Sequence, residues 1–320
     1  MKQKKILNIA LIGLGNIGSY LYKYLQKNKN TLAKKNNCIP NIIYVSAKNL
    51  KKKRSFKIPK KKWLKNYLES TKLDNVDIII ELIGGAEGAA KKLVFEALKN
   101  KKHVVTANKA LIAKYGDQLS KIAEQNNVNL EFEAAVCGGV PIVRSLKEGL
   151  IANKISKIYG ILNGTSNYIL SSMDKQDKDF EAVLNDAKKL GYAESNPKAD
   201  INGDDVSSKL KILSSLCFNS FLNNNIYVEG IKDIDKTDID NANILGYKIK
   251  LLGFAELLNN KIYQRVHPTL IKKTSYVASI DGVLNAVIVD GKPVGQSTIQ
   301  GEGAGPEATT SALISDISSV

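Results

Sequence analysis

The segment from Gly191 to Lys209 gathers acidic side chains and a lysine at a spacing that suits proton transfer. Asp205 and Lys209 are four residues apart, so a helix that begins near Gly203 would place both on one face. Asp200 lies on the loop just before them. A lysine held between acids beside an apolar core can donate or accept a proton near neutral pH if its surroundings tune its pKa. The alternative is an ordinary exposed ion pair, worth about 0.2–0.5 kcal/mol.

A second pattern suited to chemistry is the glycine loop from Gly13 to Gly18, which reads G-x-G-x-x-G after an apolar stretch and at the opening of a helix. Gly13 permits a tight turn, Gly15 lets the backbone approach a pyrophosphate, and Gly18 lets helix and strand pack closely. The helix start, at Asn16 and Ile17, offers N–H groups to the anion. With both flanks correct, this pattern predicts a dinucleotide site rather than a turn without a ligand.

The residues after the second expected strand, Asn41–Val45, bear on which dinucleotide binds. An acid there would hold the ribose 2′-hydroxyl of NAD, whereas a basic residue accommodates the 2′-phosphate of NADP. The chain instead has Ser46 and Lys48, followed by basic residues from Lys51 to Arg54, and no acid. The charge pattern predicts NADP over NAD, with Lys48 as the candidate contact.

Strands and helices alternate through residues 1–137, which predicts a Rossmann-type, doubly wound parallel sheet. The elements expected there are strands at Ile6–Ile12, Asn41–Val45, Val76–Leu82, His103–Ala107 and Val128–Ala134, and helices at Asn16–Lys34, Ala89–Asn100 and Tyr115–Asn126.

Past Cys137 the pattern changes, and residues 138–300 are expected to form an α+β substrate domain with a mixed or antiparallel sheet. Helices are expected at Pro141–Ala152, from Ser166 to Met173, and at Phe180–Leu190, Val206–Leu216 and Asn241–Leu251, and strands at Lys154–Leu162, Ile262–Val266, Tyr276–Ile280, Ala286–Val289 and Gly295–Gln300. Several of these strands are rich in exposed-looking apolar residues, and an open sheet edge or face is normally paired or covered.

Composition excludes several classes of protein. The chain has 320 residues, no run of about 18 apolar residues that would span a membrane, and a basic start that leads into a strand rather than a cleavage site. Its three cysteines are widely spaced, which argues against a zinc site or a disulfide framework and indicates a reducing, cytoplasmic setting. With only two histidines, a histidine metal centre or a Ser-His-Asp triad is not expected.

The formal charge of +16 raises nucleic-acid binding as a possible role. The lysines are nevertheless spread along the whole chain, and the densest run, Lys48–Lys62, contains only Phe56 as an interleaved aromatic residue before its end and no RNA-binding motif. The run is more simply a solvated loop near a phosphate-bearing ligand, so no nucleic-acid partner is expected.

Several segments together resemble the homoserine dehydrogenase family along nearly the whole chain. They are GLGNIGS, ELIGG (Glu81–Gly85), VTANKALIA (Val104–Ala113), EAAVCGGVPI (Glu133–Ile142), NGTSNYIL (Asn163–Leu170), the Gly191–Lys209 segment and GEGAGPEATTSALISDI (Gly301–Ile317). The resemblance implies an oxidoreductase that interconverts L-homoserine and L-aspartate 4-semialdehyde with a nicotinamide cofactor, on the route to threonine, methionine and isoleucine.

The resemblance also assigns roles to the polar residues. Lys209 matches the family's proposed proton donor, held by Asp205, and Glu194 matches the residue that binds the substrate amino group. Asp200 is expected in the substrate site. Lys109 matches a lysine that contacts substrate and cofactor, and it competes with Lys209 for the acid–base role.

Further cofactor contacts are implied at Thr106, Asn163, Gly164 and Thr165, and at Gly305, which precedes a C-terminal helix over residues 301–320 that returns to the nucleotide domain.

A monovalent cation, typically sodium, is implied beside the end of the nucleotide domain. Its ligands would be the side chain of Glu133 and the carbonyls of Val136, Gly138 and Val140, a set of oxygens that suits a hard cation. Cys137 interrupts this segment and is expected to be a small packed residue rather than a functional thiol.

The family further implies a homodimer, possibly pairing into tetramers. Longer members carry a regulatory domain of the ACT type, and nothing of that kind fits these residues, so feedback inhibition through such a domain is not expected.

Three rival interpretations remain weaker. The glucose–fructose oxidoreductase group carries Glu-Lys-Pro where this chain has Ala107-Asn108-Lys109. Aspartate-semialdehyde dehydrogenase would need a cysteine nucleophile and a histidine, for which Cys137 could be proposed, but the neighbouring motifs do not match. A non-enzymatic NADP-sensing or nucleic-acid-binding protein would use the positive charge and would show steeply salt-dependent DNA affinity.

Overall fold

The computed structural model describes residues 4–35, 38–50, 52–218 and 226–320, so Lys51 of the basic run lies outside the described residues. The chain forms two compact units: the first is Met1–Gly138 together with Gly305–Val320, and the second is Gly139–Ala304. None of the helices in the described ranges is long and apolar enough to cross a membrane.

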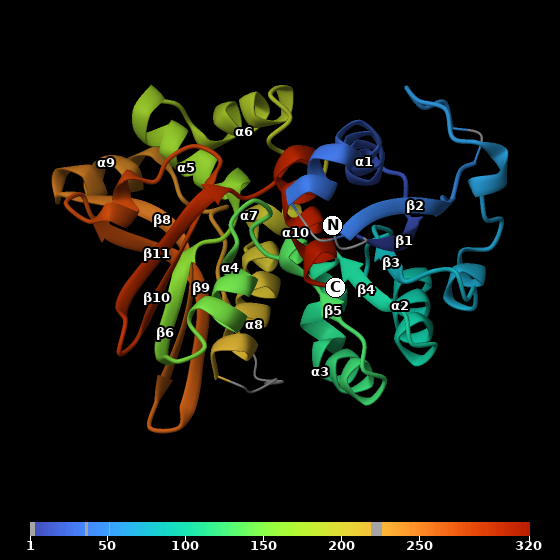
Figure 1. Ribbon diagram of the computed structural model, residues 1–320. Coiled ribbons are helices and arrows are strands. Elements are labelled where there is room, and N and C mark those ends of the chain that lie inside the picture. Colours follow the sequence, from blue (N-terminus) through green and yellow to red (C-terminus); the bar gives the residue numbers. More distant parts are fainter. Residues whose placement is uncertain (1–3, 36–37, 51, 219–225) are drawn as a thin grey trace. The chain divides into compact units, whose positions relative to one another are not determined.

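The first unit is built on a parallel sheet with strand order β2-β1-β3-β4-β5, and its helices lie on both faces (Figure 1). Helix α1 packs with α10 and helix α2 with α3. Strand β1 lies inside the sheet, between β2 and β3, and its residues are mostly apolar, as expected for a strand that is covered on both faces. Its residues Leu7, Ile9 and Leu11 are buried. The predicted doubly wound sheet is confirmed. The elements are β1 (Lys5–Ile12), α1 (Asn16–Lys35), β2 (Cys38–Ser46), β3 (Ile78–Glu81), α2 (Ala89–Lys99), β4 (His103–Thr106), α3 (Lys109–Gln125), β5 (Leu130–Glu131) and α10 (Pro306–Ser319).

Two expectations for this unit were wrong in extent. Helix α3 begins at Lys109 rather than at Tyr115, because the side chain of Asn108 accepts a hydrogen bond from the N–H of Leu111 and caps the helix six residues earlier. The strand expected over Val128–Ala134 is confined to β5, after which Glu133–Ala135 form a short 3₁₀ turn.

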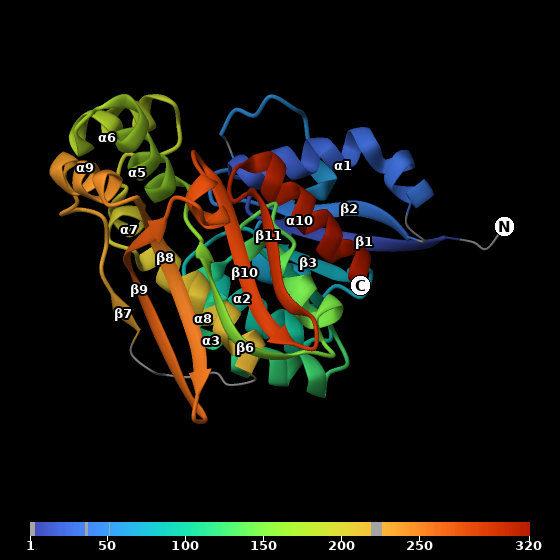
Figure 2. The ribbon, with the colours of Figure 1, turned by 90° about the vertical axis from the view of Figure 1, so that its left-hand side faces the viewer.

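The second unit contains a mixed sheet with strand order β11-β10-β6-β8-β9-β7, in which only β7 and β9 pair in parallel. Helices α5 and α8 pack on this sheet, and Figure 2 shows α8 behind the strands. The predicted α+β character is confirmed. The strands are β6 (Lys154–Ile161), β7 (Tyr227–Val228), β8 (Tyr247–Leu258), β9 (Lys261–Lys272), β10 (Leu284–Lys292) and β11 (Gly295–Glu302), and the helices are α4 (Ile142–Arg144), α5 (Gly164–Gln176), α6 (Phe180–Lys189), α7 (Lys198–Ile201), α8 (Asp204–Phe218) and α9 (Lys236–Ile244).

Three expectations for the second unit were wrong. The helix expected over Asn241–Leu251 ends at Ile244, because Gly246 adopts a φ of +80° and the chain then enters strand β8. The strand expected over Tyr276–Ile280 is a 3₁₀ turn at Tyr276–Ser279, whose hydrogen bonds are local. The helix expected over Pro141–Ala152 is only α4 followed by a π-helical turn at Ser145–Gly149.

Candidate active site

The glycine loop joins β1 to α1 and has the form that the sequence predicted. Gly13 adopts a φ of +109°, and a Cβ atom there would lie 2.3 Å from the carbonyl oxygen of Leu82. A Cβ atom on Gly18 would lie 2.0 Å from the carbonyl oxygen of Gly13. At exposed Gly15, in contrast, an added Cβ atom would meet nothing within 4 Å. The first and third glycines are therefore needed by the protein's own packing, whereas the second leaves room beside the start of α1, where an anion can bind.

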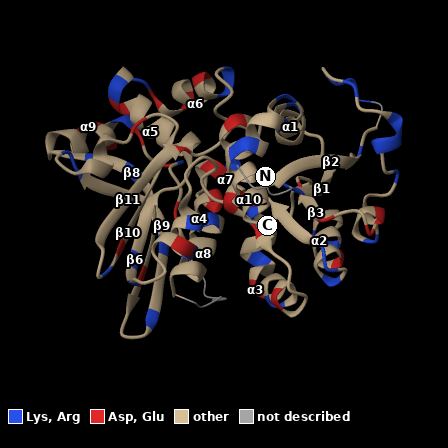
Figure 3. Cartoon of the chain, in the orientation of Figure 1, with Lys and Arg blue, Asp and Glu red and all other residues tan. Residues whose placement is uncertain are grey.

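The polar groups that follow β2 are arranged around a turn. Ser46 is buried, and its hydroxyl donates to the carbonyl of Leu64 at 3.2 Å. Arg54 donates to the carbonyls of Lys52 and Asn49, each at 3.0 Å, and its guanidinium lies 5.2 Å from the ring centre of Trp63. Lys48 is exposed. Lysine and arginine residues are otherwise dispersed over the elements of each unit, as the colouring of Figure 3 shows.

A buried carboxylate organises the loops after β3 and β4. Glu81 is fully buried, and its Oε1 accepts hydrogen bonds from the N–H groups of Ile83 at 2.7 Å and Gly84 at 3.0 Å. Its Oε2 accepts from the hydroxyl of Thr106 at 2.6 Å. The hydroxyl oxygen of Thr106 in turn accepts from the N–H of Asn108 at 3.0 Å. Glu81 therefore links both loops at the carboxyl edge of the sheet.

Asn108 continues this network toward Lys109. Its side-chain nitrogen donates to the carbonyl of Gly85 at 2.8 Å, while its side-chain oxygen caps α3. Lys109 is the first residue of α3 and is half-buried. Sequence reasoning assigned no role to Glu81 beyond its place in a motif; the signal that was present is a carboxylate that ends an otherwise apolar strand.

Asp205 and Lys209 form a buried ion pair on α8. Lys209 Nζ lies 2.7 Å from Asp205 Oδ2 and donates to the carbonyl of Leu162 at 2.7 Å. The residues are 4% and 8% exposed, which rules out the alternative of a solvated surface pair. The predicted shared helical face is confirmed.

Asn163 ties this pair to a second acid. Its Nδ2 donates to Asp200 Oδ1 at 2.8 Å and to Asp205 Oδ2 at 2.9 Å. Its Oδ1 accepts from the N–H of Ser166 at 2.8 Å and so caps α5. One amide thus holds two carboxylates beside one ammonium. An asparagine before a helix predicts the cap, but the contacts to the acids cross from β6 to α7 and α8 and leave no local signal in the sequence.

The residues next to Asn163 contact neighbouring loops. A Cβ atom on Gly164 would lie 2.6 Å from the carbonyl oxygen of Val283. The hydroxyl of Thr165 donates to the carbonyl of Tyr192 at 2.7 Å, which fixes the loop that leads to Glu194. Glu194 itself is exposed and Asp200 half-buried.

The segment expected to bind a cation follows β5. Glu133 is 3% exposed, and its N–H donates to Asp316 Oδ2 on α10 at 3.0 Å. Cys137 is buried with a φ of +54°, and Gly138 has a φ of +41°, so the chain turns sharply there. Among the described residues, no three His, Cys, Asp or Glu side chains gather in a way that could hold a metal ion; the implied site uses mostly carbonyl oxygens.

Gly305 precedes α10 with a φ of +106° and is exposed, and Pro306 occupies the first turn of the helix.

Comparison with known proteins matches both units. The family model described as "Homoserine dehydrogenase" covers residues 141–318, and the model described as "Homoserine dehydrogenase, NAD binding domain" covers residues 13–133. A homoserine dehydrogenase of Neisseria gonorrhoeae is 43% identical over 98% of this chain and 72% of its own. The corresponding protein of Bacillus subtilis is 39% identical over 99% and 73%. The crystal structure of a homoserine dehydrogenase from Thiobacillus denitrificans has a TM-score of 0.94 at 41% identity, over 99% of this chain and 74% of that one.

Replacing Gly15 by Ala should separate ligand binding from folding. Because the added methyl group meets no protein atom, the melting temperature without ligand should not change, whereas dinucleotide affinity should fall by about tenfold or more, about 1.4 kcal/mol. Calorimetric titration with the dinucleotide and a thermal melt measure the two effects. Gly18→Ala is the matched control, since its methyl group would overlap the Gly13 carbonyl and lower the melting temperature. Unchanged affinity in Gly15→Ala would contradict the assignment of this loop.

Proposed function

Because the chain belongs to the homoserine dehydrogenase family, we propose that it interconverts L-homoserine and L-aspartate 4-semialdehyde in the biosynthesis of threonine, methionine and isoleucine. The observation that carries the proposal is the buried Lys209–Asp205 pair with Asn163 and Asp200 around it. The nicotinamide cofactor, when bound, supplies or accepts the hydride. What the chain must add is a group that moves one proton and groups that hold an amino acid.

Lys209 is suited to the proton transfer. Asp205 at 2.7 Å stabilises its ammonium form, so Lys209 can protonate the oxygen that forms when the aldehyde is reduced and can take that proton back when homoserine is oxidised. The carboxylates of Asp200 and Glu194 are the groups we assign to the substrate ammonium. Burial strengthens the interaction between Asp205 and Lys209 relative to water.

Lys109 is the alternative acid–base residue. It is held at the start of α3 through Asn108, Thr106 and Glu81, next to the loop that carries Gly85. We favour Lys209 because it combines near-complete burial with a carboxylate partner, which is the usual setting of a lysine with a tuned proton affinity.

Lys209→Ala should lower kcat by roughly 10²–10⁴, the usual contribution of a general acid–base group, with a smaller change in KM. Reduction of NADP on addition of L-homoserine, followed by absorbance, measures this. Lys211→Ala is the matched control on the same helix and should retain activity. If Lys109→Ala abolishes turnover while Lys209→Ala remains active, the roles are reversed.

Absence of any homoserine oxidation by the wild-type protein, with L-malate and L-aspartate as comparison substrates, would refute the proposed function.

We propose NADP as the preferred dinucleotide. The residues after β2 include no acid to bind a ribose 2′-hydroxyl, and the hydroxyl of Ser46 is already used by Leu64. Arg54 is drawn back to the loop carbonyls. Among the exposed lysines of this segment, Lys48 is nearest in sequence to the end of β2, so we assign it to the 2′-phosphate.

Lys48→Glu should therefore weaken NADP more than NAD, because it replaces an attractive charge by a repulsive one. The ratio of kcat/KM for NADP to that for NAD should fall by at least about tenfold, about 1.4 kcal/mol. Lys57→Glu, also in the basic segment, controls for overall charge. An unchanged ratio would clear Lys48 of this role, and wild-type efficiency with NAD equal to that with NADP would refute the preference itself.

We also propose that a monovalent cation, sodium, binds the side chain of Glu133 and the carbonyls of Val136, Gly138 and Val140, because hard oxygen donors suit such a cation. The buried carboxylate and the sharp turn at Cys137 and Gly138 support it. Activity at constant ionic strength with sodium replaced by choline tests the proposal, and no change in activity would contradict it.

We propose that the enzyme works in the cytoplasm as a homodimer, which can pair further into tetramers. Large apolar side chains of the second unit are exposed on or beside the sheet, among them Tyr263 at 49% and Leu270 at 54%. Exposed apolar surface and open strands are normally covered by a partner, and a two-fold interface covers both copies at once.

Replacing Leu270 by Lys should weaken the dimer, because a charge would have to be desolvated in the interface. Light scattering at micromolar protein should give twice the 35.0 kDa chain mass for the wild type and a larger monomer fraction for the variant. Lys261→Glu, at the start of the same strand, is the control. A fully active 35.0 kDa wild-type monomer would contradict the proposal.

A further inference from the structure

The second unit also contains the buried ammonium group of Lys250, to which the proposed reaction assigns no role. Lys250 on β8 is 1% exposed, and its Nζ donates to the carbonyl of Ile280 at 2.6 Å, to Asp281 Oδ1 at 2.8 Å and to Asn167 Oδ1 at 3.1 Å. Burial lowers the pKa of Lys250, and the hydrogen bond that it donates to Asp281 opposes this. Since a buried charge costs several kcal/mol unless its hydrogen bonds are satisfied, these three acceptors are constrained to stay in place.

The acceptors hold the segment from Ile280 to Leu284 against helix α5. Asn167 Nδ2 donates to the carbonyls of Ile280 at 3.1 Å and Leu284 at 3.2 Å. The N–H of Gly282 donates to the hydroxyl of Ser171 at 3.0 Å, one helical turn further on. The segment is thereby fixed along the first half of α5.

The same segment reaches the start of α5, where the proton-transfer residues are held. The carbonyl oxygen of Val283 lies so close to Gly164 that a Cβ atom there would be 2.6 Å away. Gly164 follows Asn163, whose amide binds Asp205, and Leu162, whose carbonyl accepts from Lys209. A shift at the start of α5 therefore alters the contacts of both members of the ion pair.

We infer that Lys250 is a positioning residue of the reaction: with Asn167 and Asp281 it fixes the start of α5, and through Asn163 it sets the geometry of the Asp205–Lys209 pair. The inference rests on the proposed function, in which Lys209 carries the proton. Nothing in the role of Lys250 requires contact with the substrate or the cofactor.

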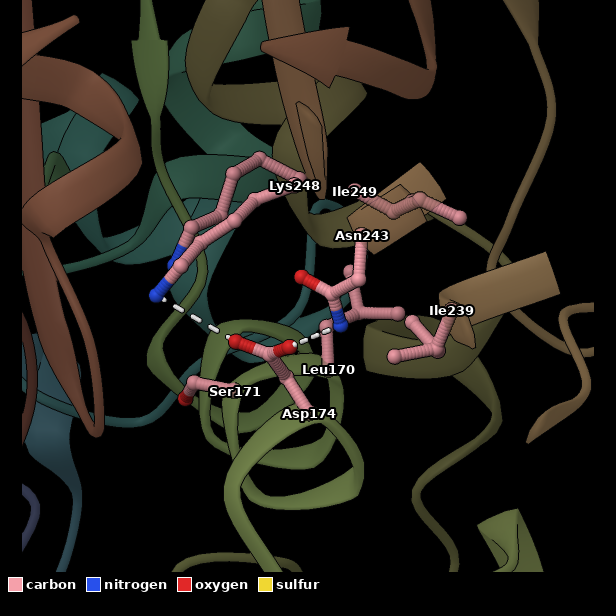
Figure 4. A pocket seen from close by; sticks show the side chains of 8 residues that line it. Leu170, Ser171, Asp174, Ile239, Asn243, Lys248 and Ile249 are labelled. Carbon is pink, nitrogen blue, oxygen red and sulfur yellow. Dashed lines mark hydrogen bonds and ion pairs between the residues drawn. The ribbon is translucent and has the colours of Figure 1, made fainter. Parts of the chain in front are cut away.

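The neighbouring lysine on β8 supplies a matched control. Lys248 and Asn243 line a small cavity and both reach Asp174 on α5, as Figure 4 shows, with Lys248 Nζ 3.2 Å from Asp174 Oδ2 and Asn243 Nδ2 2.6 Å from Oδ1. Lys248 is more exposed than Lys250, at 22% against 1% of the side chain. Lys248 Nζ also lies 3.7 Å from Asp281 Oδ2, but its shorter contact is with Asp174, which lies in the last turns of α5 rather than the first.

The first test compares Lys250→Met with Lys248→Met. Misplacement by about 1 Å can cost about 10²-fold in rate, so we expect Lys250→Met to lower kcat by about 10- to 100-fold with NADP and L-homoserine, at little change in KM for NADP. Lys248→Met should stay within about threefold of the wild type. Hydrogen exchange should accelerate over residues 161–170 in Lys250→Met only. Wild-type kcat in folded Lys250→Met would overturn the inference.

A double-mutant cycle separates positioning from a general loss of stability. Asn163→Ser keeps a side-chain oxygen that can accept from the N–H of Ser166 but removes the amide that donates to Asp205, and it adds no charge. If Lys250 acts through Asn163, adding Lys250→Met to this variant should change kcat by less than about threefold. Losses that multiply in full would show independent effects and contradict the inference.

The pH dependence of kcat adds a readout that a merely structural role would not move. Loss of a hydrogen bond to the Asp205 carboxylate disfavours its charged form, so the acid limb should shift upward in Lys250→Met as in Asn163→Ser. Charged groups that face Asp205 include Asp200, through the shared amide, and Lys209. A fall in kcat with no shift of this limb counts against positioning.

Two further measurements keep the test decisive. If Lys250→Met does not fold, Asp281→Asn removes the counter-charge while preserving shape and should show the same shift and the same pattern of exchange. A wild-type protein that does not oxidise homoserine would refute the proposed function, whereas unchanged exchange over residues 161–170 in the variant would refute the anchoring by Lys250. The two failures are therefore distinguishable.

Discussion

The burial of the Asp205–Lys209 pair is the constraint on which the second unit depends. Removing two charges from water costs several kcal/mol for each, and the loss is recovered only when close geometry and further hydrogen bonds are present. Lys209 obtains a carbonyl from Leu162, and Asp205 obtains an amide from Asn163. Both come from the turn between β6 and α5, so this turn must be placed accurately for the pair to be tolerated at all.

A similar constraint operates in the first unit, where the carboxylate of Glu81 is buried and is held by donors from two loops. Multiple hydrogen bonds to one carboxylate fix the directions of the chain after β3 and after β4, which apolar packing alone does not do as specifically. For function, the consequence is that the positions of Gly84 and Asn108 are fixed by the protein itself before any ligand binds.

Local patterns predicted much of the fold correctly. The glycine loop and the alternation of strands and helices in the first unit, and the i,i+4 placement of Asp205 and Lys209 in the second, all follow from local geometry, and all are present. The errors have local causes as well: the cap by Asn108 starts α3 early, and Gly246 ends α9 before a strand whose apolar residues had been assigned to the helix. Short apolar runs such as Tyr276–Ile280 carry too little periodicity to separate a strand from a 3₁₀ turn.

The long-range contacts of the site could not be predicted in this way, because they join residues far apart in sequence. Asn163 lies 42 residues from Asp205, and Lys250 lies 83 residues from Asn167. Each pair brings together two elements that only the completed sheet makes neighbours. A polar residue within an apolar stretch of sequence thus indicates that it has a partner in the folded protein, but which residue that partner is depends on the topology. This is why Lys250, in the middle of an apolar strand, could be noticed from sequence and yet could be understood only from its three acceptors.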